Sequence, residues 1–154
     1  MRFSIDTSAI LDGWTRHYPR EAFPGLWRQL EELIRSGDLR ATEEVMYELE
    51  KKEDDAHAWA KAQDGFFVPM DDEIQDTVSA LLADHPRLLD TRRGRSGADP
   101  FVIALAKVRG YAVVTGEHRS GSLKRPKIPD VCLALDVESM SLLDLIRREG
   151  WVFR

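Results

Sequence analysis

The sequence lacks the features that mark secreted and membrane proteins. It holds one cysteine among its 154 residues, Cys132, so no disulfide can form within the chain. A single cysteine suits a reducing compartment. No stretch approaches the roughly 20 apolar residues of a membrane span, and residues 1–6 turn acidic before an apolar leader develops. We therefore expect a cytoplasmic protein without a membrane partner.

Zinc-binding and nucleotide-binding patterns are also missing. The four histidines are scattered, and Cys132 has no second ligand at the spacing of a zinc site. No glycine-rich loop matches a nucleotide-binding fingerprint. The sequence contains no internal repeat and no low-complexity linker, and its length suits one domain with its own core. We expect a single domain over residues 1–154.

The charge balance is acidic, with 22 basic and 27 acidic residues and a net charge of −5. An acidic chain argues against a protein that coats nucleic acid non-specifically, because such a surface is basic overall. It does not argue against an enzyme that gathers carboxylates at a metal site. Hydrophobic residues make up 43% of the chain and charged residues 32%, which favours a folded protein over a disordered one.

Strand and helix patterns alternate along the chain. Helices are expected to begin at Thr7-Ser8 as a cap and at Pro24, and Asp99 and Pro100 are typical of an N-cap and first helical position. The expected strands are 2–6, 39–42, 66–68, 111–115 and 151–153; the expected helices are 9–11, 24–36, 43–52, a polar helix around Trp59, 71–83, 99–109 and 139–148. This alternation predicts an α/β fold with a mostly parallel sheet.

Acidic residues stand where these elements end. Asp6 ends the first strand, Glu117 follows the strand that ends at Thr115, and Asp99 begins the helix that leads into that strand. Ligands of parallel α/β sheets bind at the carboxyl ends of the strands. Hard cations such as Mg²⁺ need oxygen ligands, and metals so held can activate water for phosphodiester hydrolysis. Each acid alone is more often a cap or turn residue.

Four short segments together resemble the PIN-domain nucleases. Ile5–Ser8 resembles the opening motif of that family, and Val45–Leu49 is similar to the segment that supplies a glutamate from an early helix. Ala98–Ala106 and Val113–Glu117 resemble the later signature, which usually ends in Thr-x-Asp. Here Glu117 replaces the final aspartate. The resemblance runs from Asp6 to Glu117 in the family's order.

The resemblance implies a three-layer α/β/α PIN-like fold and cleavage of single-stranded or structured RNA that depends on Mg²⁺ or Mn²⁺. It implies catalytic roles for Asp6, Glu48, Asp99 and Glu117, with metal held by Asp6, Asp99 and Glu117. Helical periodicity alone does not choose between Glu48 and Glu50, which flank the buried stripe on opposite sides. The resemblance selects Glu48.

The segment Lys127–Cys132 looks like a VapC-type subgroup of bacterial toxin-like PIN proteins. Asp130 is therefore a further candidate metal ligand, and its alternative role is the N-cap of a helix through Leu133. The subgroup implies that the chain is the toxin of a toxin–antitoxin pair, with a small antitoxin partner and a homodimer. Trp14, Phe23 and Trp27 are candidates for these contacts, although core packing could use them equally.

Two basic clusters adjoin the proposed ligands in sequence. We consider them as RNA contacts because a phosphate backbone that approaches an acidic site needs neutralisation. The alternative is a pair of solvated loops. The residues are Arg92, Arg93, Arg95, Arg119, Lys124 and Arg125.

Two other functions remain open from the sequence. A phosphatase of the haloacid dehalogenase type also begins with an aspartate after its first strand, but that family resembles Asp-x-Asp and this chain has Ser8 at the second position. A PIN fold that binds RNA or a protein without cutting is the other alternative, and the presence of all four acids argues against it.

Overall fold

A single parallel sheet of five strands organises the chain, for which a computed structural model describes residues 1–89 and 97–154. The strand order is β3-β2-β1-β4-β5, and each neighbouring pair is parallel. The strands are β1 (Phe3–Ile5), β2 (Leu39–Thr42), β3 (Phe67–Val68), β4 (Ala112–Val114) and β5 (Ser139–Met140). The predicted α/β class and parallel sheet are confirmed.

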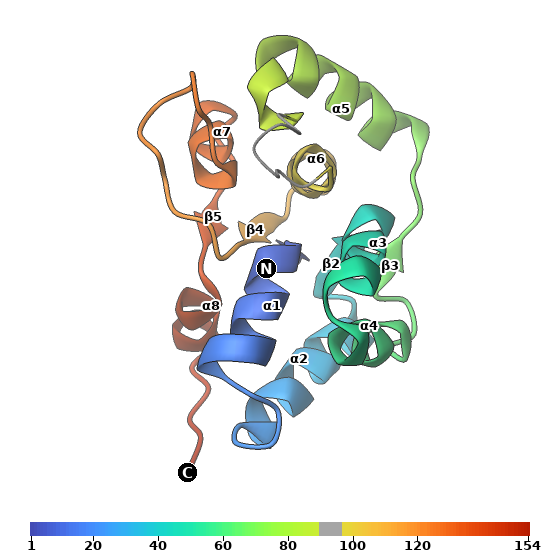
Figure 1. The fold of residues 1–154 in the computed structure, drawn as a ribbon, viewed down its shortest axis with the longest axis vertical. Coiled ribbons are helices and arrows are strands. Elements are labelled where there is room, and N and C mark those ends of the chain that lie inside the picture. Colours follow the sequence, from blue (N-terminus) through green and yellow to red (C-terminus); the bar gives the residue numbers. More distant parts are fainter. Residues whose placement is uncertain (90–96) are drawn as a thin grey trace.

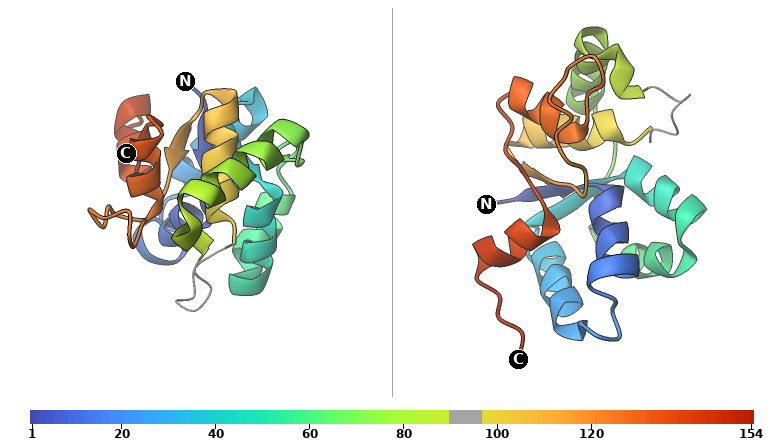
Figure 2. Two further views of the ribbon diagram at one scale, coloured as in Figure 1. Left: turned by 90° about the horizontal axis from the view of Figure 1, so that it is seen from above. Right: turned by 60° about the vertical axis from the view of Figure 1, so that its left-hand side comes forward.

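Helices cover both faces of this sheet and make three layers. Views from two sides place α5, α6 and α7 on one face and α1, α2 and α8 on the other, with α3 and α4 beside β2 and β3 (Figures 1 and 2). The helices are α1 (Thr7–Leu11), the π-helix η1 (Asp12–His17), α2 (Pro24–Ser36), α3 (Glu43–Lys52), α4 (Asp54–Lys61), α5 (Asp72–Asp84), the 3₁₀ helix η2 (Pro86–Leu89), α6 (Asp99–Arg109), α7 (Ile128–Ala134) and α8 (Leu142–Glu149). Within the described ranges, every helix is too short or too polar to span a membrane.

Helix α6 is the central helix of one layer. Its apolar residues are buried almost all round, as its sequence predicts, because it packs between the sheet and α5. The Ser4 hydroxyl of β1 donates a hydrogen bond of 2.9 Å to the carbonyl of Val102 and so ties α6 to the middle of the sheet. Gly110, at a φ of 70°, ends the helix in the left-handed conformation that glycine adopts without strain.

The C-terminal part differs from its predicted structure. Ser139 and Met140 were expected to open a helix, but they pair with Val113 and Val114 as β5. The helix begins only after Ser141, whose hydroxyl accepts a hydrogen bond of 3.1 Å from the amide of Asp144. The strand expected at residues 151–153 is wrong, because β5 already pairs with β4 on that side of the sheet and residues 151–153 lie outside it.

Three tryptophans, from η1, α2 and α4, pack against one another, and Trp27 lies edge to face with both of the others. The ring centroids of Trp14 and Trp27 are 5.0 Å apart, as are those of Trp27 and Trp59. Trp27 is 1% exposed, and its indole nitrogen donates to the carbonyl of Tyr18 at 2.7 Å. Trp27 is therefore a core residue rather than a contact for a partner, whereas Phe23 lies on the surface with 37% exposed.

Candidate metal centre

The alternation of β1 directs Asp6 toward α6. Ser4 bonds to α6, and successive side chains of a strand point to opposite faces, so Asp6 two residues later returns to the α6 side. The amide of Asp6 donates to the carbonyl of Val114 at 2.8 Å, which continues the pairing of β1 with β4 past the last strand residue. Asp6 is thus fixed at the carboxyl edge of the sheet, and it is 2% exposed.

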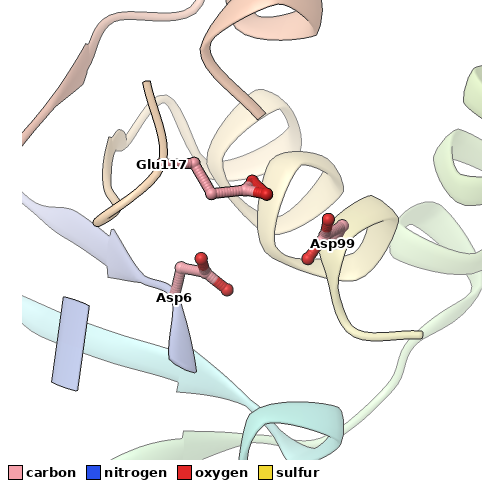
Figure 3. A group of neighbouring side chains, drawn as sticks. All are labelled: Asp6, Asp99 and Glu117. Atoms are coloured by element: carbon pink, nitrogen blue, oxygen red, sulfur yellow. The ribbon is translucent and has the colours of Figure 1, made fainter. Parts of the chain in front are cut away.

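Two more carboxylates meet Asp6 at this edge. Helix α6 leads into β4, so its first turn lies where β1 ends, and Asp99 is the first helical residue with Ala98 as the N-cap. Asp99 was predicted to be the N-cap, but it is the residue that follows the N-cap. It is 3% exposed. Glu117 arrives from the loop after β4 and is partly buried. One oxygen from each of Asp6, Asp99 and Glu117 lies within 4.8 Å of the others, and the three side chains converge in Figure 3.

Two hydroxyl groups hold Asp6 and the Glu117 loop together. Ser8 and Thr115 each donate to Oδ2 of Asp6, at 2.5 and 3.1 Å. The same hydroxyl oxygens accept from the loop, Ser8 from the amide of Gly116 at 2.9 Å and Thr115 from the amide of Glu117 at 3.1 Å. The Thr-x-Glu segment therefore fixes one acid through its threonine and supplies another through its glutamate.

Glu48 lies beside this group. Thr7 was expected to cap α1. Its side chain instead donates to Oε1 of Glu48 at 2.6 Å. Burial raises the pKa of Glu48, and the nearby charge of Asp6 raises it further. Glu50, which helical periodicity did not distinguish from Glu48, is exposed. The structure brings Glu48, and not Glu50, to the edge occupied by Asp6.

The electrostatics of the centre favour a cation. Burial raises the pKa of Asp6, although hydrogen bonds from Ser8 and Thr115 oppose the shift. Burial also raises the pKa of the Cys132 thiol to about 12, with contributions from the negative charges of Asp6 and Glu117. Oxygen donors this crowded and this buried suit a hard divalent cation, which would compensate their charge.

The extra methylene of Glu117 has a visible use. Its Oε2 accepts a hydrogen bond of 3.2 Å from the amide of Ile128, the first residue of α7. The glutamate thus spans from the loop after β4 to the start of α7 while its carboxylate stays within the acidic group. This contact links the departure from the usual Thr-x-Asp pattern to the position of α7.

Asp130 lies outside the group of three carboxylates. It is the third residue of α7 and not its N-cap, which is Lys127. Its carboxylate accepts hydrogen bonds from the amides of Ser120, Gly121 and Lys127 and from the Ser120 hydroxyl, at 2.8 to 2.9 Å. Burial alone would raise the pKa of Asp130, but these hydrogen bonds outweigh it and hold the pKa at about 2.

The predicted RNA contacts fall in two segments. Arg119, Lys124 and Arg125 are exposed on the connection between β4 and α7. Arg92, Arg93 and Arg95 lie outside the described residues. Sequence patterns pointed to the acids but did not assign a role to Ser8 or Thr115, because each of these hydroxyls also bonds to a residue more than 100 positions away along the chain.

The three layers and the parallel sheet of five strands form an α/β/α fold of the PIN-like kind. A search of solved structures finds a chain of VapBC2 from Rickettsia felis, in a crystal structure bound to a DNA fragment from their promoter. The match has a TM-score of 0.53 and 12% identity, and it covers 92% of this chain and 98% of that one. At such identity the likeness shows the fold alone.

The chain belongs to the family described as Domain of unknown function (DUF4411), whose pattern matches residues 3–153. None of the curated proteins matches it.

Proposed function

We propose that this chain is a metal-dependent endoribonuclease that cleaves single-stranded or structured RNA in the cytoplasm. The convergence of Asp6, Asp99 and Glu117 at the carboxyl edge of a parallel sheet carries the proposal. Each of these acids belongs to a different segment of the chain, and two of them are almost fully buried. Burial of carboxylates is costly without compensation, so a bound cation is the simplest reason for this arrangement.

Asp6, Asp99 and Glu117 would hold Mg²⁺ or Mn²⁺. When bound, such an ion stabilises the charge that develops on a phosphodiester and lowers the pKa of water. The protein's part is orientation: Ser8 and Thr115 fix the Asp6 carboxylate. Glu48, with its raised pKa, lies at the side of Asp6 and would orient the attacking water. No side chain of the protein forms a covalent intermediate in this scheme.

The fold of a VapBC2 chain supports a further part of the proposal, that this protein is the toxin of a toxin–antitoxin pair. A small antitoxin would then bind the chain and cover the acidic edge. We also propose a homodimer. Light scattering of the purified chain tests the dimer, and growth on induction of the chain, with and without the acidic-site substitutions, tests the toxicity.

Metal binding and cleavage, measured separately, test the enzymatic proposal. We expect calorimetry to detect Mn²⁺ binding to the wild-type chain, and a labelled RNA to be cleaved in Mn²⁺ or Mg²⁺ but not in EDTA. Glu48→Gln should slow cleavage strongly, whereas Glu50→Gln is the matched control because Glu50 is exposed. Mn²⁺ binding without cleavage of any RNA would favour a binding module, and hydrolysis of a phosphomonoester in place of RNA would favour a phosphatase.

A further inference from the structure

Asp130 holds together the loop between β4 and α7, and this role is separate from the acidic centre. We call residues 118–127, between β4 and α7, the basic loop; it is the orange segment that leads into α7 in Figure 2. Four donors of this loop, three amides and one hydroxyl, converge on the two oxygens of Asp130. Asp130 is 6% exposed, so the loop closes around it.

A carboxylate is the group best suited to this position. Every partner is an N–H or O–H donor, and an ionised carboxylate only accepts hydrogen bonds. An asparagine of the same shape would turn an NH₂ group toward these donors and lose at least one bond. Hydrogen bonds to a charged acceptor are also roughly twice as strong as neutral ones. The four bonds occupy Asp130 inside the loop, and Asp130 is not one of the three acids that converge on the centre.

The basic loop carries three exposed cations that form no salt bridge with any carboxylate among the described residues. They are Arg119, Lys124 and Arg125. Arg87 donates to the backbone carbonyl of Lys124 at 3.1 Å, which fixes the far side of the loop while leaving the Lys124 side chain available.

The loop is linked to the acidic centre at both of its ends. The loop begins directly after Glu117 and ends at Lys127, whose amide Asp130 holds at 2.8 Å. The next amide, that of Ile128, donates to Glu117. Asp130 thus anchors the same piece of backbone that contacts the Glu117 carboxylate, and the order of the loop determines where its cations lie relative to the centre.

We propose that Asp130 is a positioning residue for substrate rather than a metal ligand: it holds the basic loop at the rim of the centre, so that Arg119, Lys124 and Arg125 contact the phosphates of a single-stranded RNA. The identity of the substrate rests on the proposed ribonuclease function; the role of Asp130 in ordering the loop does not. Asp130 acts through the loop and does not touch the reacting atoms.

Three measurements on the full chain test this proposal, with Asp130→Asn as the variant. Asp136→Asn is the matched control, because Asp136 is an exposed aspartate just after α7 with a φ of 57°, which asparagine adopts readily. We expect trypsin to cut the basic loop of Asp130→Asn at least about tenfold faster than in the control, since local opening controls the rate. Mn²⁺ affinity should stay within about twofold of wild type, because no ligand is lost.

The third measurement is RNA binding in Ca²⁺ as a function of salt. We expect Asp130→Asn to bind about tenfold more weakly and with a smaller salt slope, because fewer phosphates are neutralised. In turnover the loss should appear in KM more than in kcat. The triple variant, with Arg119, Lys124 and Arg125 changed to alanine, should reproduce the binding defect and lower the salt slope by about two. The rest of the triple variant should stay as resistant to trypsin as the wild type.

Each result bears on one part of the proposal. Loss of Mn²⁺ binding in Asp130→Asn while the trypsin cleavage rate of the loop stays at the wild-type value would make Asp130 a metal ligand and overturn the positioning role. Unchanged trypsin sensitivity would overturn the ordering role. If the loop opens in Asp130→Asn but the triple variant binds RNA as tightly as wild type, the loop does not contact substrate. If the wild-type chain binds no RNA at all, the ribonuclease proposal fails, while the trypsin and Mn²⁺ results still decide the role of Asp130.

Discussion

Thr115 donates a hydrogen bond of 3.1 Å to the carboxylate of Asp6, and these two residues are 109 positions apart in the chain. The same hydroxyl oxygen accepts the amide of Glu117 at 3.1 Å. One buried side chain, 2% exposed, therefore connects an acid at the end of β1 to an acid in the loop after β4. The spacing of Thr115 and Glu117 reflects this double contact.

Removal of the Thr115 hydroxyl should loosen both acids. Thr115→Val keeps the shape of the side chain but leaves the amide of Glu117 without its acceptor, and a buried polar group left unsatisfied costs about 1–3 kcal/mol. We expect urea unfolding to show a free energy of unfolding that is lower by that amount. We also expect calorimetry to show weaker Mn²⁺ binding. Thr115→Ser retains the hydroxyl and should bind Mn²⁺ nearly as wild type does. Equal Mn²⁺ affinity in the valine and serine variants would contradict this role.

Gly116 gives the loop room to approach α1. A Cβ at this position would collide with Oδ2 of Asp12 and lie 3.1 Å from the carbonyl oxygen of Ser8. We expect Gly116→Ala to lower the free energy of unfolding by about 1–3 kcal/mol, the usual cost of overpacking. Because the closest clash is with a side chain, Asp12→Ala should restore part of this loss in the double variant.

The single variant Asp12→Ala is the control for that cycle. Within the part of the chain that the structure describes, the ion pair of Asp12 is a long one with Arg16, at 3.8 Å, and such solvent-accessible pairs contribute little to stability. Urea unfolding of the four proteins gives the coupling between positions 12 and 116. If the two effects add without coupling, the strain comes from the backbone of Ser8 and not from Asp12.

Much of the fold could be predicted because local signals mark the helix ends. Helix α3 has the predicted bounds, Glu43–Lys52, and α2 begins at Pro24 and ends before Gly37, whose φ of 87° suits only glycine well. Strand β5 was missed because two residues show no periodicity. Its pairing with β4 depends on a tertiary contact that no local pattern contains.

The candidate site could also be predicted only in part. The rule that ligands bind at the carboxyl edge of parallel strands was enough to group Asp6 with Glu117. It was not enough to place Asp130, whose four donors lie in a loop without regular structure. Nor did it assign the hydroxyl of Ser8, which bonds both to Asp6 nearby and to Gly116, a residue far away along the chain. Contacts of this kind form only when the folded chain brings separate segments together.

The stability that Asp130 contributes should persist into acid. Its pKa is lowered from 3.8 to about 2 in the folded protein, so the folded state binds the proton less readily than the unfolded state. The contribution is therefore complete above 3.8 and is lost as the pH falls through about 2. The difference in unfolding free energy between wild type and Asp130→Asn should be constant at higher pH and shrink across this window. A difference that widens on acidification would contradict the assignment.

The last prediction concerns Asp99, for which a role at the start of α6 and a role as a metal ligand make different demands. A role at the helix start needs an oxygen that accepts a hydrogen bond, and asparagine serves about as well as aspartate. A Mg²⁺ or Mn²⁺ ligand must also supply negative charge. In EDTA, Asp99→Asn should melt at the wild-type temperature or above it, because it removes one of three crowded carboxylates.

Added Mn²⁺ should then separate the two proteins. A ligand that binds only the folded state stabilises it by about 2.7 kcal/mol at 100 times its dissociation constant, so wild type should gain melting temperature and Asp99→Asn should gain little. RNA cleavage by the variant should fall by a factor of about 100 or more, the usual loss when one interaction of a catalytic centre is removed. Asp6→Asn should behave alike, since Asp6 shares the buried group. If Asp99→Asn instead cleaves RNA at the wild-type rate across a range of metal concentrations, Asp99 serves only the start of α6, and the ribonuclease proposal loses its central ligand.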